Sequence, residues 1–200
     1  MKKLCLAIVI LFFTGMTLSF SQDQPSLKVH ELGLTFSNLD NFGIRYKTGN
    51  EKTLLRLTFV ALNISSNKIS GQNQTDQTNT GMGAGFRIGF EKRIHLVQNF
   101  HLLLGSDLGI SYTYNQQENG DNKATQWVVS PAIYFVFGAA YQAGQHFIIS
   151  AEITPSLFYN YGKQKTTQTG YNDIDITNST IAFGLSNNNA SITVAYRLAK

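Results

Sequence analysis

The feature that most constrains this chain is an alternation of apolar with small or polar residues, which recurs four times between Gly81 and Tyr161. In the first run every second residue from Met82 to Phe90 is apolar, and the residues between them are glycine or arginine. Successive side chains of a β-strand point to opposite faces, so the pattern predicts strands with one apolar and one non-apolar face. The runs are longer than ordinary strands of about five or six residues, which indicates an all-β fold built from long strands.

The non-apolar face favours a membrane barrel over a soluble sandwich. A soluble sheet exposes a face rich in charged residues, whereas glycine, alanine and serine dominate this one. Small residues suit the narrow interior of a barrel of about eight strands, and the apolar face then contacts lipid. Only 14% of the residues are charged, against about 25% in typical soluble domains. The predicted fold is therefore a transmembrane antiparallel up-and-down β-barrel, with eight strands.

Alternating short and long connections support the same fold. Short periplasmic turns and longer external connections are typical of transmembrane barrels. A first outer connection near Asn38–Asp40 is short and departs from the rule. The predicted strands are 28–37, 41–48, 53–66, 80–92, 98–115, 125–142, 146–162 and 180–199. The predicted inner turns are Gly49–Lys52, Arg93–Val97 and Ala143–Gln145, and the longer polar outer loops are Asn67–Asn79, Gln116–Ala124 and Lys163–Ser179.

The N-terminus has the features of a secretory signal peptide. Two lysines precede an apolar run from Leu4 to Phe13, and small residues at Ser19 and Ser21 suit a cleavage site. We expect cleavage after Ser21, which leaves 22–200 as a single barrel domain in the outer membrane. Cys5 is the only cysteine, so the mature chain has no disulfide or thiolate chemistry. Cleavage also removes two lysines and no acids, which lowers the net charge from +4 to +2 and gives nucleic-acid binding little support.

Aromatic residues are expected to form girdles at both headgroup levels of such a barrel. The twelve steps from Phe100 to Tyr112 span roughly 30 Å at a tilt near 40°, which matches the apolar thickness of a bilayer. The predicted girdle residues are Tyr112, Tyr114, Trp127, Tyr159 and Tyr161 near the outer loops, and Phe90, Phe100, Tyr141, Phe147 and Tyr196 at the opposite ends.

The alternation changes parity at two places, and two prolines lie inside predicted strands. The apolar parity flips across Asn187–Asn189, which indicates either a bulge in one last strand, the favoured interpretation, or a turn that forms an extra hairpin. Parity also changes after Ala61, which predicts a second bulge. Pro131 and Pro155 each remove a hydrogen-bond donor inside a strand, so local bulges are expected there as well.

Charged residues on the inward parity are the candidate functional residues. An unpaired charge in a narrow lumen costs several kcal/mol, so we expect these side chains to be paired. Arginine suits this role because its planar fork holds carboxylates at fixed geometry. Two interpretations remain open, a stabilising polar filler and a selectivity filter or gate. The expected bridges run from Arg45, Arg56 and Arg87 to Glu31, Asp107 and Glu152, with Glu91 on the same face.

The chain resembles the small eight-stranded outer-membrane β-barrels of Gram-negative bacteria, of the OmpX and OmpA membrane-domain type. The resemblance rests on the signal peptide, the asymmetry of the connections, the closing strand Ser191–Leu198, and stretches such as Gly89–Arg93 and Gly105–Gly109. It covers the whole mature chain and implies an outer-membrane location. The chain ends in Leu198-Ala199-Lys200 rather than in the terminal aromatic residue usual for the family.

Catalytic and metal sites have little support in the sequence. Barrel hydrolases need a histidine with a carboxylate near the external rim, whereas all four histidines fall near the inner turns, and no two have metal-ligand spacing. The glycine-rich stretch Gly81–Gly85 lacks the helix and lysine of a phosphate-binding loop and is expected to give room inside the barrel. The histidines are His30, His95, His101 and His146.

Four functions remain open at this point. The first is a structural or interaction barrel with a charge-plugged lumen, whose polar outer loops bind a surface or envelope protein, with Lys163–Ser179 around Tyr171 as the best patch. The others are a narrow channel for ions or small solutes, a component of an envelope secretion or attachment assembly, and a soluble secreted lipocalin-like binder. No enzyme activity and no cofactor are expected.

Overall fold

The computed structural model describes residues 28–37, 42–71, 74–168, 170–185 and 189–198. The expected signal peptide, the first outer connection at 38–40, and residues 187–188 lie outside these ranges. The strands are β1 (Val29–Phe36), β2 (Phe42–Gly49), β3 (Thr53–Gly71), β4 (Gln74–Val97), β5 (Phe100–Asn119), β6 (Asn122–Ala143), β7 (Phe147–Ile153), β8 (Ser156–Gln168), β9 (Ile174–Gly184) and β10 (Ala190–Leu198).

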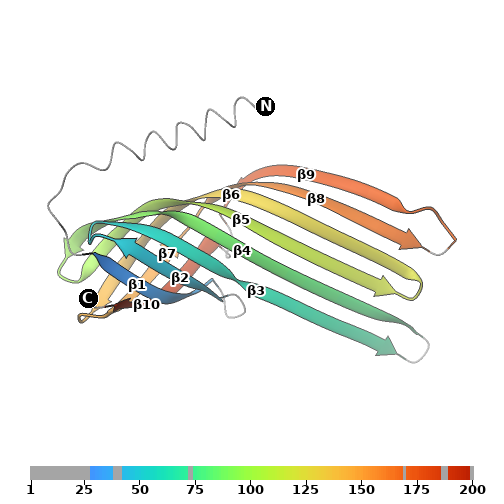
Figure 1. Cartoon of the computed structure of the whole chain (residues 1–200), viewed down its shortest axis with the longest axis horizontal. Coiled ribbons are helices and arrows are strands. Elements are labelled where there is room, and N and C mark those ends of the chain that lie inside the picture. The colour runs from blue at the N-terminus through green and yellow to red at the C-terminus, as the bar shows by residue number, and fades with distance from the viewer. Residues whose placement is uncertain (1–27, 38–41, 72–73, 169, 186–188, 199–200) are drawn as a thin grey trace.

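Eight of these strands close into a ring in the order β1-β2-β3-β4-β5-β6-β7-β10, and β10 pairs with β1. Every pairing in the ring is antiparallel, and β1 to β7 follow one another in chain order, whereas β8 and β9 lie between β7 and β10 in the sequence. The ring is seen in Figure 1 as the curved part of the molecule that contains β1, β2, β7 and β10. The prediction of an all-β, antiparallel up-and-down barrel of eight strands is confirmed.

The ten strands follow only eight paths, because two pairs of strands each continue one path. Along β6, Ile153 of β7 faces Phe137 and Ser156 of β8 faces Tyr134, so the register does not change across the break. Strands β9 and β10 also continue one path, but the register changes between them. Their ends, Gly184 and Ala190, are six residues apart, although their partners Ser156 and Ile153 are three apart.

The three extra residues between β9 and β10 explain the parity flip around Asn189. An odd number of inserted residues moves the following side chains to the opposite face. The interruption therefore acts as an enlarged bulge in a strand that keeps its direction, and the extra-hairpin alternative is wrong for the described residues. The second predicted bulge is confirmed in β3, where the pairing with β4 shifts between Val60 and Asn63.

The two prolines do not form the local bulges that were expected from them. Pro131 faces Ile110 of β5, and β6 holds the same register with β8 on both sides of it, at Val129 and Ala132. Pro131 has no backbone N–H donor, and β6 lacks two residue pairs with β8 at this point, but the register does not shift. Pro155 lies in the break between β7 and β8, while the extra residues lie in the neighbouring path between β9 and β10.

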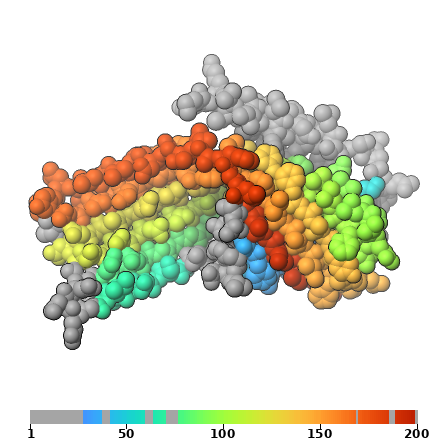
Figure 2. Space-filling view, turned by 180° about the vertical axis from the view of Figure 1, so that it is seen from behind, coloured from blue at the N-terminus to red at the C-terminus, as the bar shows by residue number. Residues whose placement is uncertain are grey.

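Beyond the ring, the wall continues as an open sheet. Strand β2 pairs with β3 only as far as Val60, and β1 ends at Phe36. The outer parts of β3, β4, β5 and β6 continue past this level with β8 and β9, and these six strands are named the open sheet. Figure 2 shows it running from β9, in red, to β3, in teal, beside the closed part.

The predicted polar outer loops are largely strands, which corrects the sequence-based boundaries. Pairing continues to Gly71 with Gln74, to Asn119 with Asn122, and to Thr166 with Ile174. These segments lack the apolar alternation, but backbone hydrogen bonding continues regardless of side-chain polarity. The polarity of a segment thus marked where the apolar wall ends and not where the strands end.

Within the ring, the two faces of each strand differ in burial as the alternation predicts. On β1, Leu32 and Leu34 are 47% and 48% exposed, whereas Glu31 is 1% exposed. The same contrast recurs on β2, where Ile44 is exposed and Arg45 is buried. The buried interior is therefore polar and charged, with a small apolar cluster of Leu103, Ala140, Ile148 and Ala195. In the part of the chain that the structure describes, no helix is long and apolar enough to cross a membrane.

Candidate functional site

The interior of the ring is filled by nine charged side chains from seven of its eight strands, named here the charge network. Alternation directs these residues inward, and the small residues between them leave the room that long side chains need. Eight of the nine are less than 9% exposed, with Arg197 the half-buried exception. The network consists of Glu31, Arg45, Lys47, Arg56, Glu91, Arg93, Asp107, Glu152 and Arg197.

Glu152 of β7 binds cations from β2 and β3. Arg45 Nη1 donates to its Oε1 at 2.8 Å and Arg56 Nη2 donates to its Oε2 at 2.8 Å. The ammonium of Lys47 lies 3.7 Å from Oε1. Arg45 also donates to the hydroxyl of Thr193 at 3.0 Å. Glu152 therefore ties β7 to strands on the opposite side of the lumen, since β7 pairs in the sheet with β6 and β10.

Glu91 of β4 forms the second centre of the network. It accepts hydrogen bonds from Lys47 at 2.6 Å, from Arg56 at 3.1 Å and from Arg93 Nε at 2.8 Å. Arg56 bridges the two centres because it donates to both Glu91 and Glu152. Its third nitrogen, Nε, lies 3.4 Å from Asp107 Oδ1 in an ion pair without hydrogen-bond geometry.

A third centre, Glu31, lies on β1. Arg93 donates a hydrogen bond to each of its carboxylate oxygens, from Nη1 to Oε1 at 2.8 Å and from Nη2 to Oε2 at 2.6 Å. Arg197 of β10 donates to Glu31 Oε1 at 3.1 Å. Charge-assisted, bidentate contacts of this kind are among the strongest hydrogen bonds in proteins. The three carboxylates together connect side chains of β1, β2, β3, β4, β7 and β10.

Six of the seven inward charges predicted from the sequence lie in this network, but their partners differ from the expected ones. Arg45 and Arg56 do reach Glu152, and Arg56 reaches Asp107, whereas Glu31 is bound by Arg93 and Arg197. The seventh, Arg87, lies apart. Its guanidinium carbon is 3.7 Å from the centre of the Tyr134 ring, a cation–π contact, and the expected bridge from Arg87 to a carboxylate is wrong among the described residues.

Sequence reasoning missed Lys47, Arg93 and Arg197. Lys47 shares the inward parity of Arg45 on β2, and Arg197 follows the outward Tyr196 on β10, so alternation alone would have found both. Arg93 was assigned to an inner turn because the predicted strand ended at residue 92, whereas β4 continues to Val97.

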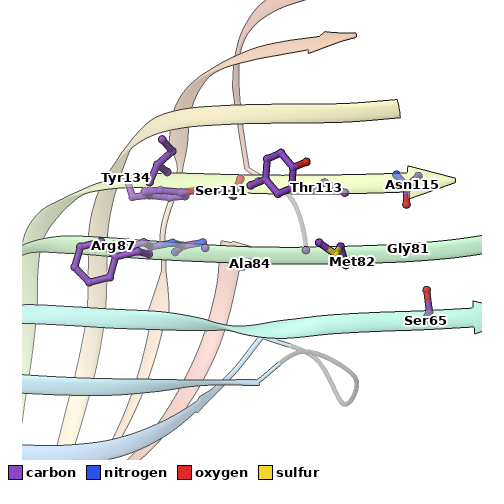
Figure 3. A pocket seen from close by; sticks show the side chains of 14 residues that line it. Ser65, Gly81, Met82, Ala84, Arg87, Ser111, Thr113, Asn115 and Tyr134 are labelled. Carbon is purple, nitrogen blue, oxygen red and sulfur yellow. The ribbon is translucent and has the colours of Figure 1, made fainter. Parts of the chain in front are cut away.

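A concave trough lies on the inner face of the open sheet, beyond the charge network. A cavity of about 320 Å³ there is lined by Ser65 of β3, by residues 81–87 of β4, by Ile110–Thr113 and Asn115 of β5, and by Tyr134 of β6. Figure 3 shows Arg87 and Tyr134 towards the closed half and Ser65, Thr113 and Asn115 along the outer part. A second cavity of about 370 Å³ shares Ser65, Gly81 and Asn115 with the first and extends it outwards.

The predicted girdle residues lie on the outward face in contact with one another at several points. At the inner end, the Phe100 and Tyr141 rings are 4.8 Å apart and the Phe147 and Tyr196 rings 5.4 Å apart. Towards the outer end, Trp127 lies 5.7 Å from Tyr161. Tyr114 faces Trp127 across the β5–β6 pairing, and Tyr112 is 40%, Tyr159 40% and Phe90 36% exposed.

Each of the four histidines contacts another side chain or the backbone. His30 Nδ1 lies 2.7 Å from the Tyr46 hydroxyl, His95 and His101 lie with ring centres 5.4 Å apart, and His146 Nδ1 lies 3.2 Å from the Arg197 carbonyl. In the described part of the chain, no group of three or more histidine, cysteine, aspartate or glutamate side chains could hold a metal ion.

Comparison with known proteins relates this chain to others by fold alone. No model of a protein family matches the sequence, and no curated protein matches it. Among solved structures, the fold is similar to that of a major outer membrane protein from Thermus thermophilus, with a TM-score of 0.55 over 86% of this chain and 100% of that chain, at 8% sequence identity. The chain therefore has the fold of an outer-membrane β-barrel, while the narrower resemblance to the OmpX and OmpA type stays a prediction.

Proposed function

We propose that the mature chain, residues 22–200, is an integral outer-membrane β-barrel that acts as a closed scaffold and presents its polar open sheet to other molecules outside the cell. The main observation in support of this proposal is the inverted polarity of the ring. Leucine, isoleucine and phenylalanine are exposed on its outside, and paired charges are buried on its inside. Such a surface is unstable in water and stable in lipid.

The charge network supports a scaffold over a channel. Side chains from opposite walls meet across the lumen, as Arg56 of β3 does with Glu152 of β7. Removing one partner of a buried ion pair costs several kcal/mol, so opening a path for ions would require breaking several strong contacts together. We therefore favour a plugged lumen over the narrow-channel alternative.

The open sheet supports an interaction role through its outer hairpins. The β8–β9 hairpin carries Tyr171 at its tip with 74% of its surface exposed. Beside it, Lys165 donates to Asp173 at 2.6 Å, and this hydrogen bond lowers the pKa of the Asp173 carboxyl. An exposed aromatic side chain at the tip of a paired hairpin is suited to contact another macromolecule, because tyrosine is enriched among the residues that dominate binding energy.

Cysteine labelling of the full chain in a Gram-negative host tests the location and the orientation together. The expected mature chain has no cysteine, so Tyr171→Cys and Gly144→Cys each create a single thiol at opposite ends of the molecule. The proposal predicts that both variants fractionate with the outer membrane and resist carbonate extraction. A membrane-impermeant maleimide should label Tyr171→Cys on intact cells, and Gly144→Cys only after lysis.

Two outcomes would contradict this proposal. Release of the protein by carbonate would show a soluble or peripheral protein, as the lipocalin-like alternative requires. Labelling of Gly144→Cys on intact cells, with Tyr171→Cys protected, would reverse the orientation and remove the external role of the open sheet.

A further inference from the structure

We propose that the trough on the inner face of the open sheet binds a saccharide that carries a carboxylate or phosphate, with Arg87 as the anion-binding residue. This site lies outside the charge network, and the scaffold role does not require it. The proposal rests on the orientation of one guanidinium, on the polar atoms that converge along the trough, and on the lining of the adjoining cavity.

Arg87 is presented as an anion-binding group by the Tyr134 ring. A guanidinium carbon 3.7 Å from a ring centre uses the face of the guanidinium for the cation–π contact. The N–H donors of arginine lie in the plane of the group, so they remain directed away from the contact and can bind an anion in a fork. Among the described residues, no carboxylate lies within ion-pair distance of Arg87, unlike the arginines of the network.

A glycine makes this arrangement possible. Arg87 of β4 and Tyr134 of β6 lie on either side of β5, where Gly109 faces Arg87 in the pairing. A Cβ at Gly109 would lie 2.9 Å from Tyr134 Cε2 and 3.0 Å from Arg87 Cγ. Any larger residue at this position would therefore push the two side chains apart, and the stack across β5 depends on the absence of a side chain there.

Further out along the trough, hydroxyl and amide groups converge above two more glycines. A Cβ built at Gly81 would lie 3.0 Å from both Ser65 Oγ and Asn115 Oδ1, so these two oxygens approach the same point from either side. Among the side chains that the structure describes, the Thr113 hydroxyl lies nearest to a Cβ built at Gly83, at 3.9 Å. These hydroxyl and amide groups thus lie beside the glycines of β4.

The second cavity extends the same chemistry outwards. Its side chains include Asn67, Asn79, Gln117, Gln126 and Gln164. Of the described residues that line the two cavities, Arg87 is the only charged one. Amides and hydroxyls both donate and accept hydrogen bonds, which fits a ligand with many hydroxyl groups, and a single cation at the inner end fits one anionic group. An acidic oligosaccharide combines these properties.

The test uses the folded full-length mature protein in detergent micelles, with trigalacturonic acid as the probe, measured by calorimetry and by saturation-transfer NMR. We expect saturable binding that weakens by about tenfold or more in Arg87→Gln, because a charge-assisted fork is lost. Lys163→Gln is the matched control, since it removes one positive charge from the outward face of β8 and should leave binding unchanged.

A second variant keeps the proposal falsifiable if Arg87→Gln folds poorly. At Gly83 a Cβ would meet its nearest atoms at ordinary van der Waals distances, so Gly83→Leu fits the backbone and fills the trough while it leaves Arg87 intact. Binding should be lost in this variant, with the heat-modifiable gel mobility of the barrel unchanged.

Two comparison ligands separate the parts of the proposal. Maltotriose, which has a similar size and no charge, should bind at least about tenfold more weakly than trigalacturonate. Inorganic phosphate should compete only at much higher concentration. Absence of saturable trigalacturonate binding, equal binding by Arg87→Gln, or equal competition by inorganic phosphate would each overturn the assignment.

Discussion

At the scale of single residues, the carboxylate of Glu152 connects β7 to cations of β2 and β3 across the lumen. It accepts two hydrogen bonds at 2.8 Å from arginines of β2 and β3, and Lys47 lies 3.7 Å away. Lys47 and Arg56 also pair with Glu91, whereas Glu152 is the one carboxylate paired with Arg45 among the described residues. Glu152 is 3% exposed, so bulk solvent cannot replace it.

The substitution Glu152→Gln is expected to lower the free energy of unfolding by about 3–5 kcal/mol, because it leaves the buried Arg45 without its carboxylate partner. Urea titration of the refolded protein in micelles, followed by the fluorescence of Trp127 and by gel mobility, measures this change. Glu118→Gln is the matched control, since Glu118 pairs with Lys123 on the surface with 45% of its side chain exposed. The control should change stability by less than about 1 kcal/mol, and an equal loss in both variants would contradict a central role for Glu152.

The alternation along a strand predicts which face of the sheet a residue lies on, but it does not predict which residues of other strands lie beside it. The inward direction of Arg45, Arg56 and Glu152 follows from alternation within each strand. The pairing of Glu31 with Arg93 depends on the register between β1, β2, β3 and β4, and no single strand contains that information. For the same reason, parity put Arg87 on the correct face and gave it the wrong neighbours.

At the scale of elements, hydrogen bonds connect two joints, the break between β7 and β8 and the break between β9 and β10. Thr154 N donates to the Asn189 carbonyl at 2.6 Å, and Asn189 Nδ2 donates to the Thr154 carbonyl at 2.6 Å and to Ser156 Oγ at 3.3 Å. Asn189 is 9% exposed. Its side chain replaces the backbone pairing that Pro155 and the inserted residues interrupt.

The substitution Asn189→Ala should therefore lower stability by about 1–3 kcal/mol, because it leaves the buried Thr154 carbonyl without the amide that it accepts from. Asn178→Ala on the exposed part of β9 is the control and should have an effect within about 0.5 kcal/mol. The same urea titration measures both variants. A neutral Asn189→Ala would mean that the joint is held by backbone contacts alone.

Strand positions could be predicted from the sequence more reliably than strand lengths. The apolar alternation located all eight paths, including the re-registering bulge near Asn189. The alternation did not reveal the outer hairpins. Residues between Gln116 and Thr125 are mostly polar on both faces of the hairpin and therefore show no apolar pattern, although they pair in register. The length of β4, which contains Arg93, was underestimated at its inner end in the same way.

At the scale of the whole molecule, the closed ring is shorter than the apolar wall. Strand β1 has eight residues, which span roughly 20 Å at a tilt near 40°. On β4 and β5 the exposed apolar face continues beyond the ring, with Met82 47% and Tyr112 40% exposed. One side of the molecule is thus apolar over a greater height than the other, and Trp127 lies on the taller side.

This asymmetry predicts where Trp127 lies in a membrane. Trp127 is the single tryptophan, so its fluorescence reports one position. In vesicles of brominated lipid, bromine near the headgroup should quench it more strongly than bromine at the end of the acyl chain, because indole rings favour the interface. Unquenched fluorescence in every lipid would place Trp127 outside the membrane and contradict the height assigned to the wall.

The central claim is that the ring is closed and its lumen filled by the charge network. Planar-bilayer conductance of the mature protein, with heat-modifiable gel mobility as proof of a folded barrel, tests it most directly. We expect the wild-type barrel to pass no ion steps, because Arg56 and Glu152 join opposite walls at 2.8 Å. Stable, reproducible steps from a verified barrel would contradict the claim and establish a channel instead.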